Sequence, residues 1–301
     1  MKLTILGCYS ATPRVNTNPT SQVLETKGNI FLIDCGEGTQ VQLRKNKIKF
    51  SRIKHIFISH LHGDHYFGLV GLISTFRLMS RETDLHIYCP KGLKEVITLQ
   101  MKLADSWTNY QLIFHELDSD SSKLIYKDEK VEVHTIPLKH RVYANGFLFR
   151  EKEGQRKLNM EAVLENNIDV SYYRKLQQGF DVKNKEGKLI ENTLVTKPGT
   201  KSKSYAFCSD TAYSEAIVPV IKEVDTLYHE ATFLEQHKKL TTSTKHSTAK
   251  QAAEIANQAQ VGKLILGHYS TRYKDLETFR KEAQTVFEQV ELAEDGKTFE
   301  F

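Results

Sequence analysis

The sequence lacks the features that would mark a disulfide-bonded or membrane-spanning protein. Its 301 residues include four cysteines, none of them in a C-x-x-C pair, which excludes a thiolate zinc knuckle and a disulfide framework. No run of about 18 apolar residues occurs, so no segment is expected to cross a membrane. The amino terminus reads as a strand from Leu3 to Gly7 and has no export-signal pattern. We therefore expect a cytoplasmic protein with reduced cysteines.

A strong charge imbalance is also missing. The 42 basic and 37 acidic residues leave a formal net charge of +5, which only mildly favours a polyanionic partner. The hydrophobic content of 40% is sufficient for a substantial core, in one large domain or two closely packed halves.

Strand-like apolar runs alternate with helical patterns along most of the chain, which favours helices covering sheets. We expect helices from Thr248 to Gln260, where alanines form a narrow stripe, and near Glu215 to Glu223. A further helix is expected over Tyr66 to Met79, with one face formed by Phe67, Val70, Gly71, Ser74 and Leu78.

Residues 150–203 differ from the rest of the chain. This stretch is polar, is interrupted by glycines, and carries twelve basic against eight acidic residues, so it holds most of the excess positive charge. Two interpretations remain open on composition alone: an appendage that contacts phosphates, or a solvated excursion with no partner.

Four potential metal ligands lie within six residues, directly after the apolar strand His55 to Ile58: His60, His62, Asp64 and His65. Imidazole and carboxylate are the ligands that zinc accepts where water must remain bound. His60 and His62 share one side of an extended backbone, so they can bind one ion. Gly63 permits a sharp turn, so Asp64 and His65 can face a second ion nearby. Histidines on a loop with no common partner would leave several buried polar groups uncompensated, so we favour the metal site.

Two zinc ions need more ligands than this motif offers. His140, Asp210 and His268 each follow a predicted strand, where active-site groups are commonly found. Taken singly, a strand-end histidine is more often structural, but together with the motif these residues form the expected complement. Aspartate can bridge two ions because it has two carboxylate oxygens.

Two further positions indicate acid and base chemistry. Glu230 follows an apolar strand, and His246 stands at the start of a predicted helix. A glutamate can hold an imidazole in its protonated form, so we expect His246 to donate a proton and Glu230 to orient it. A surface histidine at a helix start is the alternative. Asp34, at another strand end, could brace a metal-bound histidine.

With these residues identified, nearly the whole chain resembles the ribonuclease Z family of the metallo-β-lactamase superfamily. The resemblance is carried by Asp34 to Gln40, His60 to Leu69, Ser209-Asp210-Thr211, His229 to Phe233, His246-Ser247-Thr248 and Gly267 to Tyr273. It implies an α+β protein with a four-layer αββα sandwich, usually a homodimer, in which residues 1–301 form one catalytic domain and residues 150–203 a flexible inserted arm that binds tRNA.

The resemblance also implies an activity and a ligand set. The expected reaction is cleavage of precursor tRNA after the discriminator nucleotide, leaving a 3′-hydroxyl. By analogy His60, His62 and His140 hold one zinc ion, Asp64, His65 and His268 hold the other, and Asp210 bridges them, while Asp64 also orients or deprotonates the attacking water. Manganese is a possible substitute for zinc.

The first loop departs from the family pattern, because Val15 and Thr17 stand where basic residues are often found. Rejection of a mature CCA end therefore stays open, and the arm also lacks the usual Gly-Pro signature. Two rival functions remain: another phosphodiesterase or arylsulfatase-like hydrolase acting on a small ester, and a catalytically silent nucleic-acid-binding protein.

Overall fold

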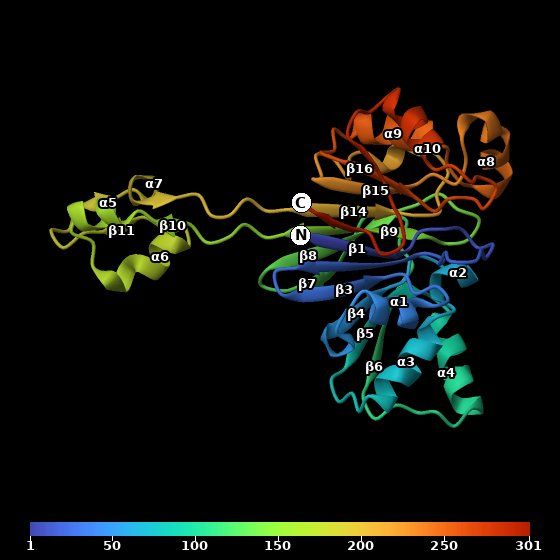
Figure 1. Cartoon of the computed structure of the whole chain (residues 1–301). Coiled ribbons are helices and arrows are strands. Elements are labelled where there is room, and N and C mark those ends of the chain that lie inside the picture. Colours follow the sequence, from blue (N-terminus) through green and yellow to red (C-terminus); the bar gives the residue numbers. More distant parts are fainter.

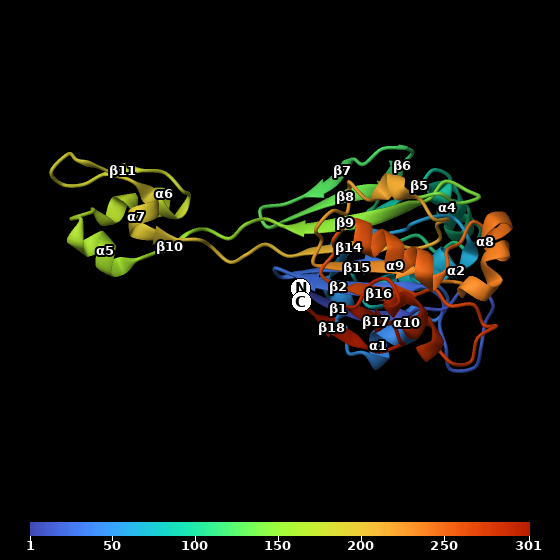
Figure 2. The same ribbon diagram turned by 90° about the horizontal axis from the view of Figure 1, so that it is seen from above.

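The computed structural model describes residues 1–301 and has two facing β-sheets with helices on their outer sides (Figure 1). One segment stands well apart from these layers and is connected to them by two extended stretches of chain (Figure 2). None of the helices has the length and apolar character needed to cross a membrane.

The first sheet has seven strands in the order β18-β1-β2-β3-β4-β5-β6. Strands β1 to β3 form an antiparallel meander, whereas β3 to β6 run parallel. The bounds are β1 Lys2–Gly7, β2 Ser21–Thr26, β3 Asn29–Ile33, β4 Ile53–Phe57, β5 Leu85–Pro90, β6 Leu112–Leu117 and β18 Thr298–Glu300.

The second sheet also has seven strands, in the order β17-β16-β15-β14-β9-β8-β7. Its strands β14 to β17 are parallel, and β7, β8, β9 and β14 pair antiparallel. The bounds are β7 Leu124–Lys127, β8 Val131–Pro137, β9 Asn145–Glu151, β14 Ser204–Cys208, β15 Thr226–Glu230, β16 Leu264–Gly267 and β17 Val290–Leu292. Parallel strands end at one edge of a sheet, so loops from both sheets can meet there.

Helices cover both outer faces (Figure 1). Those on the first sheet are α1 Thr39–Lys45, α2 Gly63–Tyr66, α3 Leu69–Leu78 and α4 Leu93–Leu103, and those on the second are α8 Lys238–Thr244, α9 Ala249–Gln258 and α10 Glu277–Gln284. The alanine stripe predicted for α9 is confirmed, because Ala249, Ala252, Ala253 and Ala256 are all buried.

Two helix predictions are wrong in detail. The stretch from Tyr66 to Met79 is broken at Gly68, whose backbone lies so close to Gly36 that an added Cβ would be 2.2 Å from the Gly36 carbonyl oxygen. Its buried face is Leu69, Leu72, Ile73 and Phe76, while Phe67 and Leu78 are exposed. Only a 3₁₀ turn, Glu215–Ile217, forms where a helix to Glu223 was expected, because Pro219 has no N–H to continue it.

Two large apolar clusters hold the layers together. The larger has 45 buried residues, among them Phe31, Phe57, Phe147, Phe149 and Phe207. Several of these rings lie edge-to-face across the gap between the sheets, as Phe57 does with Phe147 and Phe149. The smaller cluster has 21 buried residues and joins the first sheet to α1, α3 and α4. The strand ends that carry polar side chains are therefore anchored in a rigid core.

The segment between β9 and β14 forms short elements of its own, apart from the two sheets. It comprises β10 Lys157–Leu158, α5 Met160–Glu165, η2 Val170–Tyr172, α6 Tyr173–Gln177, β11 Val182–Lys183, β12 Leu189–Ile190, α7 Asn192–Val195 and β13 Thr196–Lys197. Six buried apolar residues form its own small cluster, which is separate from the two main ones. We call residues 154–199 the arm; they lie within the insertion predicted at residues 150–203, whose first two residues belong to β9.

Candidate metal centre

Seven side chains that were predicted as metal ligands meet at the carboxyl ends of the strands. They follow β4, β8, β14 and β16, and groups of them lie within 4.8 Å of one another. Asp210, His268 and Asp34 have positive φ values of 60°, 59° and 55°. This left-handed backbone is uncommon outside glycine. It turns the chain sharply at the end of each strand.

The first group consists of three histidines. Nε2 of His60 lies 3.0 Å from Nδ1 of His62, and Nε2 of His140 lies 3.1 Å from the same atom. Oδ2 of Asp210 completes the group, at 3.5 Å from Nε2 of His60 and 3.7 Å from Nε2 of His140.

The second group lies on the other side of Asp210. Its Oδ1 atom is 3.1 Å from Nε2 of His65 and 3.0 Å from Nε2 of His268. Oδ2 of Asp64 is 3.4 Å and 3.6 Å from these two nitrogens. The two oxygens of Asp210 therefore face different groups, which is the arrangement of a bridging carboxylate.

The donor set and its spacing fit divalent metal ions. Ligand atoms about 2.0–2.2 Å from one tetrahedral zinc ion lie roughly 3.3–3.6 Å apart, and the atoms above are separated by 3.0 to 3.7 Å. Moreover, Nε2 of His65 and Nε2 of His268 are buried, and the carboxylate oxygens near them are not aligned to form a hydrogen bond with either nitrogen. Such atoms are costly unless something else binds them.

Hydrogen bonds to Nδ1 fix the orientation of His60 and His65. Nδ1 of His65 lies 2.7 Å from Oδ2 of Asp34, in the bracing position expected for this aspartate. Ser59 donates its hydroxyl to the same carboxylate at 2.9 Å and lies 3.0 Å from Nδ1 of His60. Both imidazoles are thus held with Nε2 toward the centre.

His268 and His140 are oriented in the same way. Thr232 donates its hydroxyl to Oε2 of Glu230 at 2.6 Å, so its oxygen accepts from Nδ1 of His268 at 3.0 Å. Nδ1 of His140 donates to the main-chain oxygen of Lys245 at 3.0 Å. Sequence reasoning had assigned no role to Ser59 or Thr232, because neither belongs to a ligand pattern.

His246 and Glu230 form a buried ion pair beside the ligands. Nδ1 of His246 is 2.8 Å from Oε1 of Glu230, which also accepts from the Thr211 amide at 2.9 Å. Burial opposes charge on His246, but the Glu230 carboxylate overcomes this and raises the histidine's pKa to about 9. The imidazole therefore holds its proton at neutral pH. The ring stacks on His268 with centroids 5.3 Å apart.

The centre has an excess of negative charge that requires a cation. Burial alone would lower the pKa of His65, yet the carboxylates of Asp210, Asp34 and Asp64 hold it well above its usual range. A proton or a metal ion can supply this positive charge. The structure thus brings all nine predicted site residues together. His140, Asp210, Glu230 and His268 were predicted from their places after apolar strands, His60, His62, Asp64 and His65 from their density in one motif, and His246 from its place at a helix start.

Comparison with known proteins identifies relatives over almost the whole chain. It is 45% identical over 295 residues to ribonuclease Z of Bacteroides fragilis, covering 98% of this chain and 97% of the relative. Ribonuclease Z of Porphyromonas gingivalis is 46% identical over 283 residues, covering 94% and 93%. A family model described as Anti-Pycsar protein Apyc1 matches residues 1–153, a range that ends before Asp210 and His268.

Solved structures agree with these relatives. The short form of human tRNase Z (ELAC1) superposes with a TM-score of 0.72 at 27% identity, covering 100% of this chain and 99% of that one. The metallo-β-lactamase fold protein YhfI from Bacillus subtilis gives a TM-score of 0.69 at 19% identity, covering 99% and 98%. The expected metallo-β-lactamase fold is thereby confirmed.

Proposed function

The chain belongs to the ribonuclease Z family and, through residues 1–153, to the family described as Anti-Pycsar protein Apyc1, and we propose that it removes the 3′ trailer from precursor tRNA. The observation that carries this conclusion is 45% identity to a ribonuclease Z over 98% of the chain. The protein is an endoribonuclease, and a divalent metal is part of its reaction.

For the metal we propose two zinc ions, with manganese as a possible substitute. His60, His62 and His140 would hold one ion, Asp64, His65 and His268 the other, and Asp210 would bridge them. Bound there, the ions would supply a hydroxide near neutral pH and neutralise charge on the phosphate. The unpartnered nitrogens of His65 and His268 support this assignment.

The side chains around the ligands suit phosphodiester hydrolysis. We propose that Asp64 orients the attacking water and accepts its proton. The bond between phosphorus and the 3′ oxygen then breaks, and His246 donates a proton to that oxygen, which leaves a 3′-hydroxyl on the tRNA and a 5′-phosphate on the trailer. Glu230 keeps His246 charged and correctly oriented through its 2.8 Å contact.

We further propose that the arm binds tRNA outside the active site. Residues 150–203 carry most of the chain's excess positive charge, and the arm projects far beyond the sheets (Figure 2). Such a basic extension suits contact with the phosphate backbone of a substrate much larger than the cleft.

A homodimer in the cytoplasm is also part of the proposal. Helix α4 exposes Val96, Leu99 and Leu103 on its outer side, which suits burial against a second copy of the chain. All four cysteines are free and buried, as is usual in a reducing compartment.

The test is incubation with a precursor tRNA that carries a 3′ trailer, followed by mapping of the product ends. We expect a cut directly after the discriminator nucleotide with a 3′-hydroxyl on the tRNA. A parallel assay uses bis(p-nitrophenyl) phosphate as a small ester. Hydrolysis of the ester with no cleavage of any precursor tRNA would favour the rival small-ester hydrolase.

A further inference from the structure

The cleft over the ligand cluster contains two arginines that the reaction above does not use. The cleft has a volume of about 430 Å³, and its lining includes Arg141 and Arg272. Hydroxyl side chains form much of the remaining wall: Ser10, Thr12, Thr232, Thr244 and Ser270. Apart from histidines, the other charged side chains in the lining are Asp64 and Asp210, which belong to the proposed ligand set. The cleft therefore presents cations and hydroxyl donors to whatever covers the centre.

Arg141 comes from the loop between β8 and β9, directly after His140. Its side chain is exposed and makes no ion pair or hydrogen bond within the chain. It lines the cleft together with His62. Arg141 thus belongs to the wall that carries the first ligand group.

Arg272 comes from the loop after β16, four residues beyond His268. The main chain around it is well fixed: the Arg272 amide donates to Oγ of Ser270 at 3.3 Å, and the Tyr273 carbonyl accepts from Nη1 of Arg14 at 3.1 Å. The Arg272 guanidinium, in contrast, is exposed and has no partner within the chain. A fixed backbone therefore presents a free cation on the wall that carries the second ligand group.

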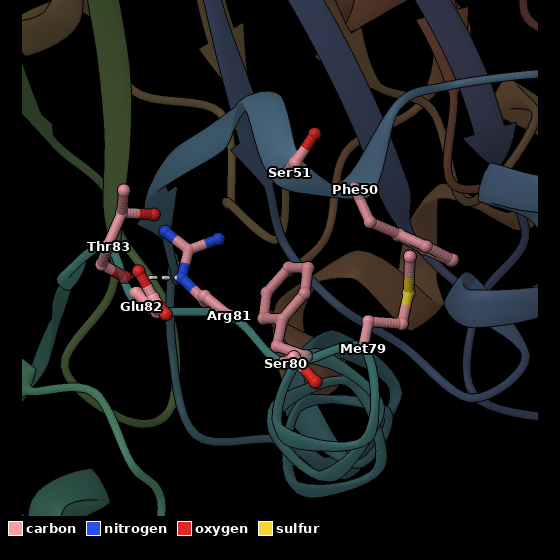
Figure 3. Close-up of a pocket in the computed structure, with 8 residues that line it drawn as sticks. Phe50, Ser51, Met79, Ser80, Arg81, Glu82 and Thr83 are labelled. Atoms are coloured by element: carbon pink, nitrogen blue, oxygen red, sulfur yellow. Dashed lines mark hydrogen bonds between the residues drawn. The ribbon is translucent and has the colours of Figure 1, made fainter.

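Arg81 shows what a structural arginine looks like in this fold. It is only 7% exposed, and its guanidinium donates to the main-chain oxygens of Thr83, Ile53 and Asp84 at 2.6, 2.9 and 2.9 Å. Figure 3 shows Arg81 beside Thr83, in a pocket lined by Phe50 and Phe76. Its guanidinium carbon lies 4.8 Å from the centroid of the Phe76 ring. Arg141 and Arg272 have no such internal task.

We propose that Arg141 and Arg272 bind the two phosphates that flank the scissile phosphodiester, one arginine to each phosphate. The inference rests on the proposed function. A scissile phosphate above Asp210 has the two ligand groups on its two sides, and each arginine comes from the loop that follows one group's last ligand. The guanidinium fork matches phosphate oxygens, and its charge is permanent. These contacts would hold the RNA in register over the centre.

The test uses Arg141→Ala and Arg272→Ala with three precursor tRNAs. One precursor is unmodified, and the other two carry an uncharged methylphosphonate in place of the phosphate on the 5′ or the 3′ side of the scissile bond. On the unmodified precursor each variant should lose about 10- to 100-fold in kcat/KM. That loss should largely disappear on one methylphosphonate precursor, and this precursor should differ between the two variants.

Three controls distinguish loss of phosphate binding from a general loss of activity or of bound metal. Arg77→Ala removes an exposed, unpaired arginine at the end of α3, outside the cleft, and should cleave like the unaltered protein. Bis(p-nitrophenyl) phosphate has no flanking phosphates, so both cleft variants should hydrolyse it normally. Bound metal, measured after dialysis, should also be unchanged.

The proposal fails if each variant's loss persists on both methylphosphonate precursors, or if ester hydrolysis falls in parallel with RNA cleavage. It also fails if both variants cleave the unmodified precursor normally. If instead the unaltered protein does not cleave precursor tRNA at all, the proposed function itself is wrong.

Discussion

The sheets and the arm are built on very different scales. The sheets enclose apolar clusters of 45 and 21 buried residues, whereas the arm has a cluster of six. The arm also exposes six large apolar side chains: Met160, Leu164, Val170, Phe180, Leu189 and Leu194. A six-residue core is marginal by itself. The molecule thus places its chemistry on a rigid scaffold, from which a weakly stabilised extension projects.

Rigidity is needed where coordination distances must be reproduced. Asp34, Asp210 and His268 adopt left-handed backbone conformations at the ends of buried strands, and such conformations persist only when the surroundings enforce them. An extension that follows a charged backbone needs far less precision, since electrostatic contacts tolerate displacement.

The largest contrast should come from a change in the metal centre. His62→Ala removes the histidine whose Nδ1 lies near both His60 and His140. We expect loss of bound metal and a fall of at least about 10⁴-fold on precursor tRNA and on bis(p-nitrophenyl) phosphate alike. Metal analysis after dialysis and both activity assays check this.

The matched control is His134→Ala on β8, outside the ligand cluster. It should retain about two zinc ions per chain and both activities. Equal metal in the two variants would contradict the role given to His62.

Removal of the arm should separate the two substrates. The two stretches of chain that connect the arm to the sheets are paired with each other. The Glu151 amide donates to the Lys203 carbonyl at 2.8 Å, and the Gly154 amide donates to the Thr200 carbonyl at 3.4 Å. Gly154 and Gly199 are therefore close enough for the residues between them to be replaced by a short Asn-Gly turn. We expect kcat/KM for precursor tRNA to fall by about 10³-fold, because a second binding contact is lost.

Hydrolysis of the small ester by the same variant should stay within about twofold, because the metal centre lies on the sheets. Steady-state kinetics on both substrates are the measurement. If precursor tRNA is cleaved as before, the arm is not the tRNA-binding element.

The ligand positions were predictable because their signal is local. His60, His140, Asp210 and His268 each follow an apolar run, and the ends of such strands meet in layered folds of this kind. The buried face of α3 was missed although the sequence contained its signal. Leu69, Leu72, Ile73 and Phe76 are large apolar residues at helical spacing, whereas the face that was predicted includes Gly71 and Ser74.

Hydrogen-bond partners were harder to predict than ligands. Thr232 links His268 to Glu230, and Ser59 links His60 to Asp34. Serine and threonine are common throughout the sequence, so only the folded geometry distinguishes these two. The helix expected near Glu215 failed for a reason that the sequence did contain, the proline at 219.

A smaller loss should follow from changing the proton donor alone. His246→Gln removes the donor but no proposed ligand, so bound metal should be retained. We expect kcat for precursor tRNA to fall by about 10²- to 10³-fold, with KM little changed. A p-nitrophenolate leaving group needs no proton, so ester hydrolysis should fall by less than about tenfold.

This variant can be told apart from removal of the arm by the kinetic constant that changes. Loss of the donor lowers kcat, whereas loss of the arm should raise KM for the RNA. An unchanged kcat for His246→Gln, or loss of its metal, would refute the assignment of His246 as proton donor.

The smallest effect should come from weakening the arm without removing it. Leu176 on α6 is fully buried in the six-residue cluster, whereas Leu194 on α7 is 62% exposed. Leu176→Ala should cost the arm about 2–5 kcal/mol of local stability, enough to unfold so small a core, and Leu194→Ala should have little effect.

Hydrogen exchange should report faster opening of residues 154–199 only in Leu176→Ala, with protection of the sheets unchanged. KM for precursor tRNA should rise by about tenfold with kcat preserved, since the unfolded arm keeps its charge but loses its shape. A melting transition of the sheets that shifts with the arm would mean that the two regions unfold as one cooperative unit.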